Sequence, residues 1–226
     1  MLRADTSREA LMVRRVAAAV GAGALVTAVA AAAYPALLRT RCLTWGATPE
    51  EVGRQMPGDD LLPEPDLVAT RAVTVAAQPS AIWPWLVQMG SGRGGAYTYD
   101  WIENLFGLGM HSADEILPQF QDLEVGDVLP VGPKGPHMRV EVLDPEQAVV
   151  FRSEDGNWVW AFALYPDGGN TRLVSRNRIA APNASFARRL VNLLVMEPGS
   201  VVMEAKMLNG IKERAERLSS QWPVTA

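Results

Sequence analysis

The sequence predicts an α+β fold in which an antiparallel β-sheet curls around a long C-terminal helix, behind one apolar N-terminal helix. Three observations support this fold class. Residues 16–38 carry no charged side chain. Residues 127–179 alternate between apolar and polar side chains, with Gly and Pro in the gaps. The C-terminal stretch returns to the spacing of an amphipathic helix, and strands followed by such a helix are typical of an α+β domain.

Composition narrows the possible functions. The chain has 226 residues, of which 48% are hydrophobic, so it can bury one good-sized core. A net charge of -4, with no Lys/Arg-rich run after the first helix, predicts that it binds no nucleic acid. The single cysteine, Cys42, excludes an internal disulfide. His111 and His137 lack companions at metal-ligand spacing, so we expect neither a metal site nor a cofactor.

The first element is an apolar segment, residues 16–38, which follows a basic segment, residues 1–15. As a helix the apolar segment spans roughly 34 Å, enough to cross a bilayer. It is either a retained signal anchor or a signal peptide cleaved before Tyr34. We favour the anchor because apolar Leu37 and Leu38 continue past that point. The chain is thus expected at the cell membrane as a single-pass protein, with an extracytoplasmic domain favoured.

A linker is expected next, over residues 39–66. Thr48 and Glu51 form a capping box that opens a short helix. Residues 57–66 contain three prolines and four acidic side chains, a composition that favours extended, solvated backbone. The folded domain is therefore expected over residues 67–219.

The domain begins with a strand over residues 68–76, followed by a helix over residues 79–89. A second helix is expected from about Thr98 to Gly107, with its buried face formed by i,i+4 pairs of large apolar side chains. A capping box starting at Ser112 predicts a short third helix.

The next region carries the remaining strands and the closing helices. The turn residues 166–170 predict consecutive antiparallel pairing. Pro198 interrupts the helical pattern, so we expect one helix from about Ser185 and a longer one from about Gly199, before a tail over residues 220–226. Five strands are expected here, over residues 127–131, 138–143, 148–153, 158–165 and 171–179.

Three stretches carry a resemblance to a known family: Ala77 to Leu86 (AQPSAIWPWL), Arg93 to Asn104 (RGGAYTYDWIEN) and Met203 to Lys212 (MEAKMLNGIK). Across residues 67–218 the chain resembles the START-like, or SRPBCC, superfamily of lipid-transfer proteins, polyketide cyclases and aromatase-like proteins, in a bacterial membrane-anchored subgroup. The resemblance implies a helix-grip fold, with a cavity between sheet and helix for a small hydrophobic ligand. Six strands are expected here against the superfamily's usual seven, so closure of that cavity stays open.

The candidate ligand-binding residues lie around the first two helices of the domain, on two strands and on the closing helix. Core packing is favoured for Trp85 and Trp101, and Tyr97 and Tyr99 are evenly balanced between pocket and core. Arg176 binds a ligand anion if it faces inward, although solvent exposure or a salt bridge is favoured. The full set is Trp85, Tyr97, Tyr99, Trp101, Trp158, Trp160, Phe162, Arg176, Met203 and Met207.

For two strands of this set, the direction in which the side chains face remains open. On the strand from Trp158, either the Trp face or the opposite face with Ala161 and Ala163 meets the long helix. Arg178 shares the face of Arg176.

The glycine-rich run over residues 90–95 satisfies the dinucleotide fingerprint literally, but a helix precedes it where that fingerprint needs a strand. We interpret the run as a flexible connection at the cavity entrance.

The favoured function is a non-catalytic binder of a lipid or polyketide-like molecule, because no catalytic constellation is present. The alternative is an enzyme of the cyclase or dehydratase kind, in which Tyr99, Asp100, Glu103 or His111 moves a proton at an enolisable carbon. A third, weaker reading is a membrane-tethered interaction module with an exposed apolar patch. The catalytic residues, if any, and the oligomeric state are left open.

Overall fold

The computed structural model describes residues 34–132 and 137–221. The chain divides into two compact units at residue 40. The described residues of the first unit are helical, in a π-helical turn η1 (Tyr34–Leu38) that runs into α2 (Arg39–Leu43). No helix in the described residues is both long and apolar enough to cross a bilayer. Most of the expected anchor, residues 16–38, lies outside the described residues.

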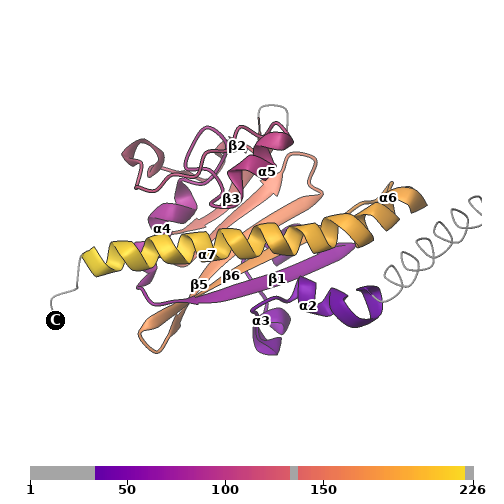
Figure 1. Cartoon of the computed structure of the whole chain (residues 1–226), viewed down its shortest axis with the longest axis horizontal. Helices are drawn as coiled ribbons and strands as arrows, with labels where there is room; N and C mark the ends of the chain where they lie inside the picture. The colour runs from indigo at the N-terminus through magenta and orange to yellow at the C-terminus, as the bar shows by residue number, and fades with distance from the viewer. Residues whose placement is uncertain (1–33, 133–136, 222–226) are drawn as a thin grey trace, which may run out of the picture. The chain divides into compact units, whose positions relative to one another are not determined.

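The second unit is built on one antiparallel sheet, as the alternating pattern predicts. Its spatial order is β1-β6-β5-β4-β3-β2, so the first strand pairs with the last (Figure 1). A bulge between Val140 and Val142 interrupts the register of β3 and β4. The strands are β1 (Leu67–Val75), β2 (Val128–Pro130), β3 (His137–Asp144), β4 (Ala148–Ser153), β5 (Trp158–Asp167) and β6 (Asn170–Ile179).

Short helices lie between β1 and β2, and a long one closes the chain. Figure 1 shows this last helix running across the sheet, which is the arrangement of a helix grip. The helices of the unit are α3 (Pro49–Gly53), η2 (Asp59–Leu61), α4 (Pro79–Val87), α5 (Asp100–Leu105), η3 (Pro118–Phe120), α6 (Phe186–Val191), η4 (Asn192–Met196) and α7 (Glu197–Gln221).

The capping box at Ser112 does not open a helix. The Ser112 backbone N–H and hydroxyl both donate to the Asp100 carboxylate, at 2.8 and 2.5 Å. The hydroxyl therefore stabilises the loop against α5, and the next helical turn begins only at Pro118. The expectation of a third helix here was wrong because a distant carboxylate binds the capping residue.

The closing helix is continuous where the sequence predicts a break. Segments α6, η4 and α7 follow one another without a gap, although Pro198 lies in the first turn of α7. Proline has no N–H to donate and its ring crowds the preceding turn. The π-helical turn η4 directly before it widens the backbone at that point, which lets the helix continue.

The concave face of the sheet and α7 enclose the main core. The Trp face of β5 belongs to this core, which settles the choice of faces, since Ala161 and Ala163 pack on the opposite face. Below the middle of α7 the space is filled by fully buried side chains: Val75, Phe162, Leu173, Met207, Leu208 and Ile211.

A second core covers the convex face, and the segment expected to be a solvated linker forms it. Residues 41–66 belong to the same compact unit as the sheet. The buried Met56 packs with Val150, Val159 and Val174. A Cβ at Gly58, which has a positive φ of 86°, would lie 2.5 Å from the Val150 side chain, so only glycine permits this close approach. The linker expectation is therefore corrected for these residues.

Candidate functional site

A buried polar cluster lies on the concave face beneath the N-terminal half of α7. Arg71 of β1 is paired in register with Ser175 of β6, and both side chains reach Glu204 of α7. Arg71 forms an ion pair with Glu204, and the Ser175 hydroxyl donates to the same carboxylate at 2.6 Å. The Asn177 amide donates to both Glu204 oxygens at 3.2 Å. Three side chains of the sheet thus hold one carboxylate from the helix.

Two indoles of β5 extend this cluster. The Trp158 ring N–H donates to the Asn177 side-chain oxygen at 2.8 Å, and the Trp160 ring N–H donates to the Ser175 hydroxyl at 3.0 Å. The two rings are stacked, with centroids 5.6 Å apart. Both are only partly buried, although they belong to the face that meets the helix. They form a partly exposed aromatic wall bonded to a buried polar centre.

Burial sets the electrostatics of the cluster. It raises the pKa of the Glu204 carboxyl above its ordinary value, while Arg71, Ser175 and Asn177 oppose the shift. The other two nitrogens of the Arg71 guanidinium also donate, to the Ser200 hydroxyl at 2.9 Å and to the Cys42 carbonyl at 3.0 Å. The charges of Arg71 and Glu204 therefore compensate each other within the core.

The alternation of polar residues on β6 is a sequence signal for part of this cluster. Ser175 and Asn177 alternate with Arg176 on β6, so one pair of polar residues had to lie on each face. Arg71 and Glu204 were missed because their pairing spans 133 residues, which no local pattern reveals.

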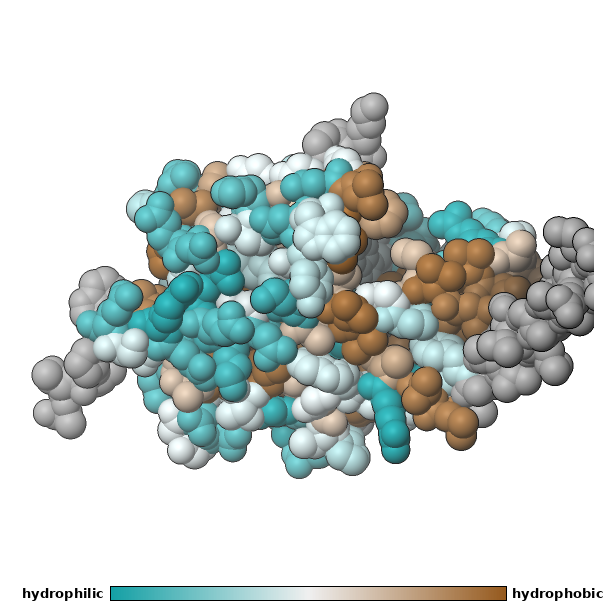
Figure 2. Space-filling model, viewed as in Figure 1, coloured by the Kyte–Doolittle hydropathy of each residue, from teal (hydrophilic) through white to brown (hydrophobic). Residues whose placement is uncertain are grey.

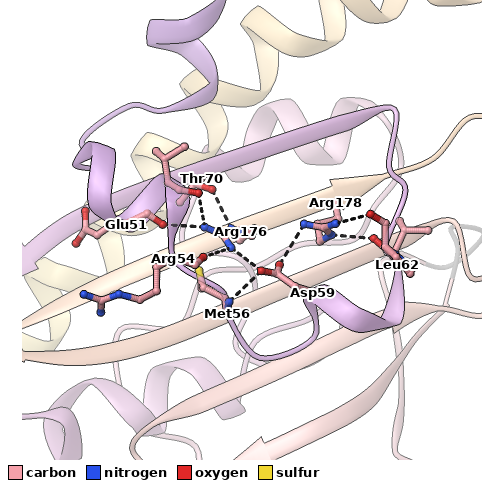
Figure 3. A network of polar contacts seen from close by, with 10 residues as sticks. Glu51, Arg54, Met56, Asp59, Leu62, Thr70, Arg176 and Arg178 are labelled. Atoms are coloured by element: carbon pink, nitrogen blue, oxygen red, sulfur yellow. Dashed lines mark hydrogen bonds and ion pairs between the residues drawn. The ribbon is translucent and has the colours of Figure 1, made fainter.

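Arg176 and Arg178 lie on the convex face, away from the main core (Figure 3). Arg176 is 3% exposed and donates to the Asp59 carboxylate at 2.7 Å, to Thr70 and to three backbone carbonyls of the segment before β1. Arg178 donates to the same carboxylate at 3.3 Å and to the Leu62 carbonyl at 2.9 Å. Arg176 does not face inward; it forms the salt bridge that was favoured, although its anion, Asp59, comes from η2 and not from a neighbouring strand.

Trp85 and Tyr97 are core residues. Tyr97 is fully buried, its hydroxyl donates to the Trp85 carbonyl at 2.9 Å, and the two rings meet edge to face. Burial raises the pKa of the Tyr97 phenol. Tyr97 has a φ of 58°, and a Cβ at Gly210 of α7 would lie 2.6 Å from its carbonyl oxygen. These two aromatics therefore fix α7 against the loop after α4.

The other candidates divide between core and surface. Met207 is buried in the main core and Met203 is half-buried. Tyr99 is exposed, and Trp101 on α5 is 70% exposed. The helix around Trp101 was expected to bury i,i+4 pairs, but Leu105 and Phe106 are exposed as well. Six of the ten candidate ligand residues belong to the main core: Trp85, Tyr97, Trp158, Trp160, Phe162 and Met207.

Of the four candidate proton-transfer residues, Glu103 alone is both buried and incompletely bonded. His111 and Tyr99 are exposed, and Asp100 binds Ser112. One Glu103 carboxylate oxygen is buried without a hydrogen-bond partner in the described part of the chain. Burial raises the pKa of Glu103, and the negative charge of Asp100 adds to this effect.

The surface of the described residues includes two pockets of similar size. One, of about 610 Å³, is lined by η2 and the convex-face arginines; the other, of about 640 Å³, lies between α4, residues 114–116 and the end of α7. Neither lies beneath the middle of α7, where the core is filled. Neither pocket is therefore the expected cavity between the sheet and the closing helix. No group of three or more potential metal ligands occurs in residues 34–132 and 137–221.

No family model and no curated protein matches the sequence. Solved structures that align with the chain include a polyketide-cyclase-like protein of Corynebacterium glutamicum, 16% identical, covering 69% of this chain and 90% of that one, with a TM-score of 0.34. A protein of Bacillus halodurans is 14% identical over 67% and 99% of the two chains, with a TM-score of 0.42. A protein of Chromobacterium violaceum is 12% identical over 66% and 98%, with a TM-score of 0.41.

The expected helix-grip architecture is present in the chain itself. The antiparallel sheet, with β1 against β6, and the long closing helix over its concave face make up the helix grip.

Proposed function

We propose that the protein is a membrane-tethered START-like protein that binds a small hydrophobic ligand, such as a lipid or polyketide-like molecule, against Trp158 and Trp160. The observation that carries the proposal is the pair of partly exposed indoles bonded to the buried Ser175 and Asn177. Ligand sites are typically apolar and aromatic, with a few placed polar groups. This part of the concave face has that composition.

The filled core limits where a ligand can lie. Near Leu208 and Ile211 the space below α7 is occupied, whereas the helix carries the half-buried Met203 beside the polar cluster. Methionine side chains are flexible and adapt to what they pack against. Binding is therefore proposed at the N-terminal half of α7, with movement of Met203 admitting the ligand.

The charges of the cluster favour a neutral ligand. Arg71 is already neutralised by Glu204, so a ligand carboxylate would add an unpaired buried charge, at a large free-energy cost. A hydroxyl or carbonyl group can instead share the hydrogen bonds of Ser175, Asn177 and the indoles. The proposal thus favours an alcohol, ketone or ester over a free acid.

A pair of probes tests this proposal. The full chain, purified in detergent, is titrated with cis-parinaric acid and with its methyl ester, following fluorescence transfer from tryptophan above the micelle background. We expect saturable binding that is tighter for the ester. Trp160→Ala is expected to weaken it at least tenfold, whereas Tyr165→Ala, on the other face of the same strand, leaves it unchanged. No saturable binding of either probe would overturn the proposal.

The membrane tether is proposed from residues 16–38 alone. Its test is extraction of membranes with alkaline carbonate, which leaves a spanning protein in the pellet. Release of the full chain into the supernatant would contradict the tether without affecting the ligand site.

Glu103 favours a second candidate function, acid-base catalysis of the cyclase or dehydratase kind. A buried carboxyl with a raised pKa and an unbonded oxygen is suited to moving a proton. The test is deuterium exchange at the enolisable carbon of a β-keto thioester, above the rate in buffer. If Glu103 is catalytic, the original chain promotes exchange and Glu103→Gln abolishes it. Equal exchange in the original chain and the variant would exclude this candidate function.

A further inference from the structure

The segment formed by α6 and η4 exposes an unusual amount of apolar surface. None of the α6 side chains is buried, and Phe186 is 82% exposed. Helices of soluble proteins normally bury one apolar stripe, and a contiguous exposed apolar patch marks an interaction surface. The exposed apolar side chains here are Phe186, Leu190, Val191, Val195 and Met196. Figure 2 shows apolar residues gathered at the end of the molecule where Figure 1 labels α6.

The charges beside these apolar residues are positive. Arg188 and Arg189 are exposed in α6, and no acidic residue occurs between Asp167 and Glu197. Arg188 makes no ion pair within the described residues, and Arg189 reaches Asp66 only at 3.8 Å. This local charge contrasts with the net charge of -4 for the whole chain. Apolar side chains flanked by arginines are the pattern of a helix that lies in the interface of an anionic bilayer.

The apolar surface also lies close to the point where the chain enters the second unit. Arg71 donates to the Cys42 carbonyl and to the Ser200 hydroxyl, so both groups lie around one guanidinium. Ser200 follows Met196 by about one helical turn, or roughly 6 Å along the axis. The N-terminal end of the second unit, at Cys42, therefore lies near η4.

From these observations we propose that the α6–η4 surface, comprising Phe186, Arg188, Leu190, Val191, Val195 and Met196, rests in the headgroup region of an anionic membrane. The inference builds on the proposed tether. It adds that the unit is oriented on the bilayer by a second contact. Because Glu204 follows this surface by two turns of α7, the proposed ligand site then lies next to the membrane.

The test uses the full chain, with Cys42→Ser, reconstituted in nanodiscs that contain phosphatidylglycerol. Leu190→Cys carries an NBD label, and Glu213→Cys, at an exposed position near the other end of α7, is the matched control. We expect the label at 190 to be blue-shifted and quenched by lipids that bear a spin label near the headgroup, and the label at 213 to show neither effect. Arg188→Glu should reduce the quenching at 190 severalfold, whereas Arg217→Glu leaves it unchanged.

Each other outcome overturns the inference. Equal, weak quenching at both positions means that the surface does not touch lipid. A blue shift at 190 without lipid quenching means that protein covers the surface, either residues 16–33 or a second copy. Carbonate extraction of membranes that contain the same chain distinguishes these results from failure of the tether. If the chain stays in the pellet and the label at 190 is not quenched, the docking surface is contradicted and the proposed function is not.

Discussion

Two arginines are buried on opposite faces of the sheet, and each is neutralised by a carboxylate from outside the sheet. Arg71 is bound by Glu204 of the closing helix, and Arg176 by Asp59 of η2. A buried guanidinium without an anion is strongly destabilising. Each ion pair therefore specifies how a separate segment packs on the sheet, one for α7 and one for residues before β1.

Removing one partner of the concave-face pair should be costly. Glu204→Ala leaves Arg71 buried without its anion, so we expect the free energy of unfolding to fall by about 3–5 kcal/mol. The double variant Arg71→Met/Glu204→Leu should recover most of this loss, because it removes both charges. Urea denaturation followed by circular dichroism measures both changes. Asp114→Ala, which breaks an exposed pair with Arg214, should change stability by less than about 1 kcal/mol.

Glu103 should make stability depend on pH. Burial raises its pKa in the folded chain, so the folded state holds a proton that the unfolded state releases near the ordinary value of 4.5. Its contribution to stability is therefore complete below about pH 4.5 and is lost as pH rises through the raised pKa. Glu103→Gln should flatten this decline and stabilise the chain at pH 7. Unfolding midpoints measured from pH 4 to pH 8 check this, and parallel curves for both proteins would contradict it.

At the scale of elements, residues 41–66 and the closing helix behave differently from their sequence patterns. Prolines and acids in residues 57–66 are typical of solvated backbone, yet Asp59 pairs with Arg176 and Arg178, and Met56 fills the second core. Pro198 is typical of a helix break, yet η4 lets the helix continue. In both cases contacts or backbone geometry outside the local pattern determine the outcome.

Met56 tests whether residues 41–66 are structural. Met56→Ala opens a cavity against Val150 and Val174, and we expect it to lower the free energy of unfolding by about 2–4 kcal/mol. Gln55→Ala, at the exposed neighbouring position, should stay within about 0.5 kcal/mol of the original. Equal, small effects at both positions would mean that the segment does not pack on the sheet in solution.

At the scale of the whole molecule, the sheet separates two cores, each covered by a different part of the chain. Helix α7 covers the concave face and residues 41–66 cover the convex face. The compact unit therefore includes more of the chain than residues 67–219, the domain expected from the sequence.

Truncation tests this division. A chain that begins at Arg41 keeps both cores and should fold, with a cooperative thermal transition. A chain that begins at Leu67 exposes Val150 and Val174 and leaves Arg176 without Asp59, so it should aggregate or unfold. Circular dichroism and gel filtration distinguish the two results. A soluble, cooperatively folding chain from Leu67 would contradict the structural role of residues 41–66.

The sequence by itself determined the strands, their antiparallel order from β2 to β6 and the long closing helix, because alternation and helical spacing are local patterns. It also determined which side chains share a face, such as Trp158 with Trp160 and Arg176 with Arg178. Only the tertiary structure decided which face meets α7 and which carboxylate each arginine binds. Those choices depend on partners 133 and 117 residues away, for Arg71 and Arg176 respectively, and no local pattern records them.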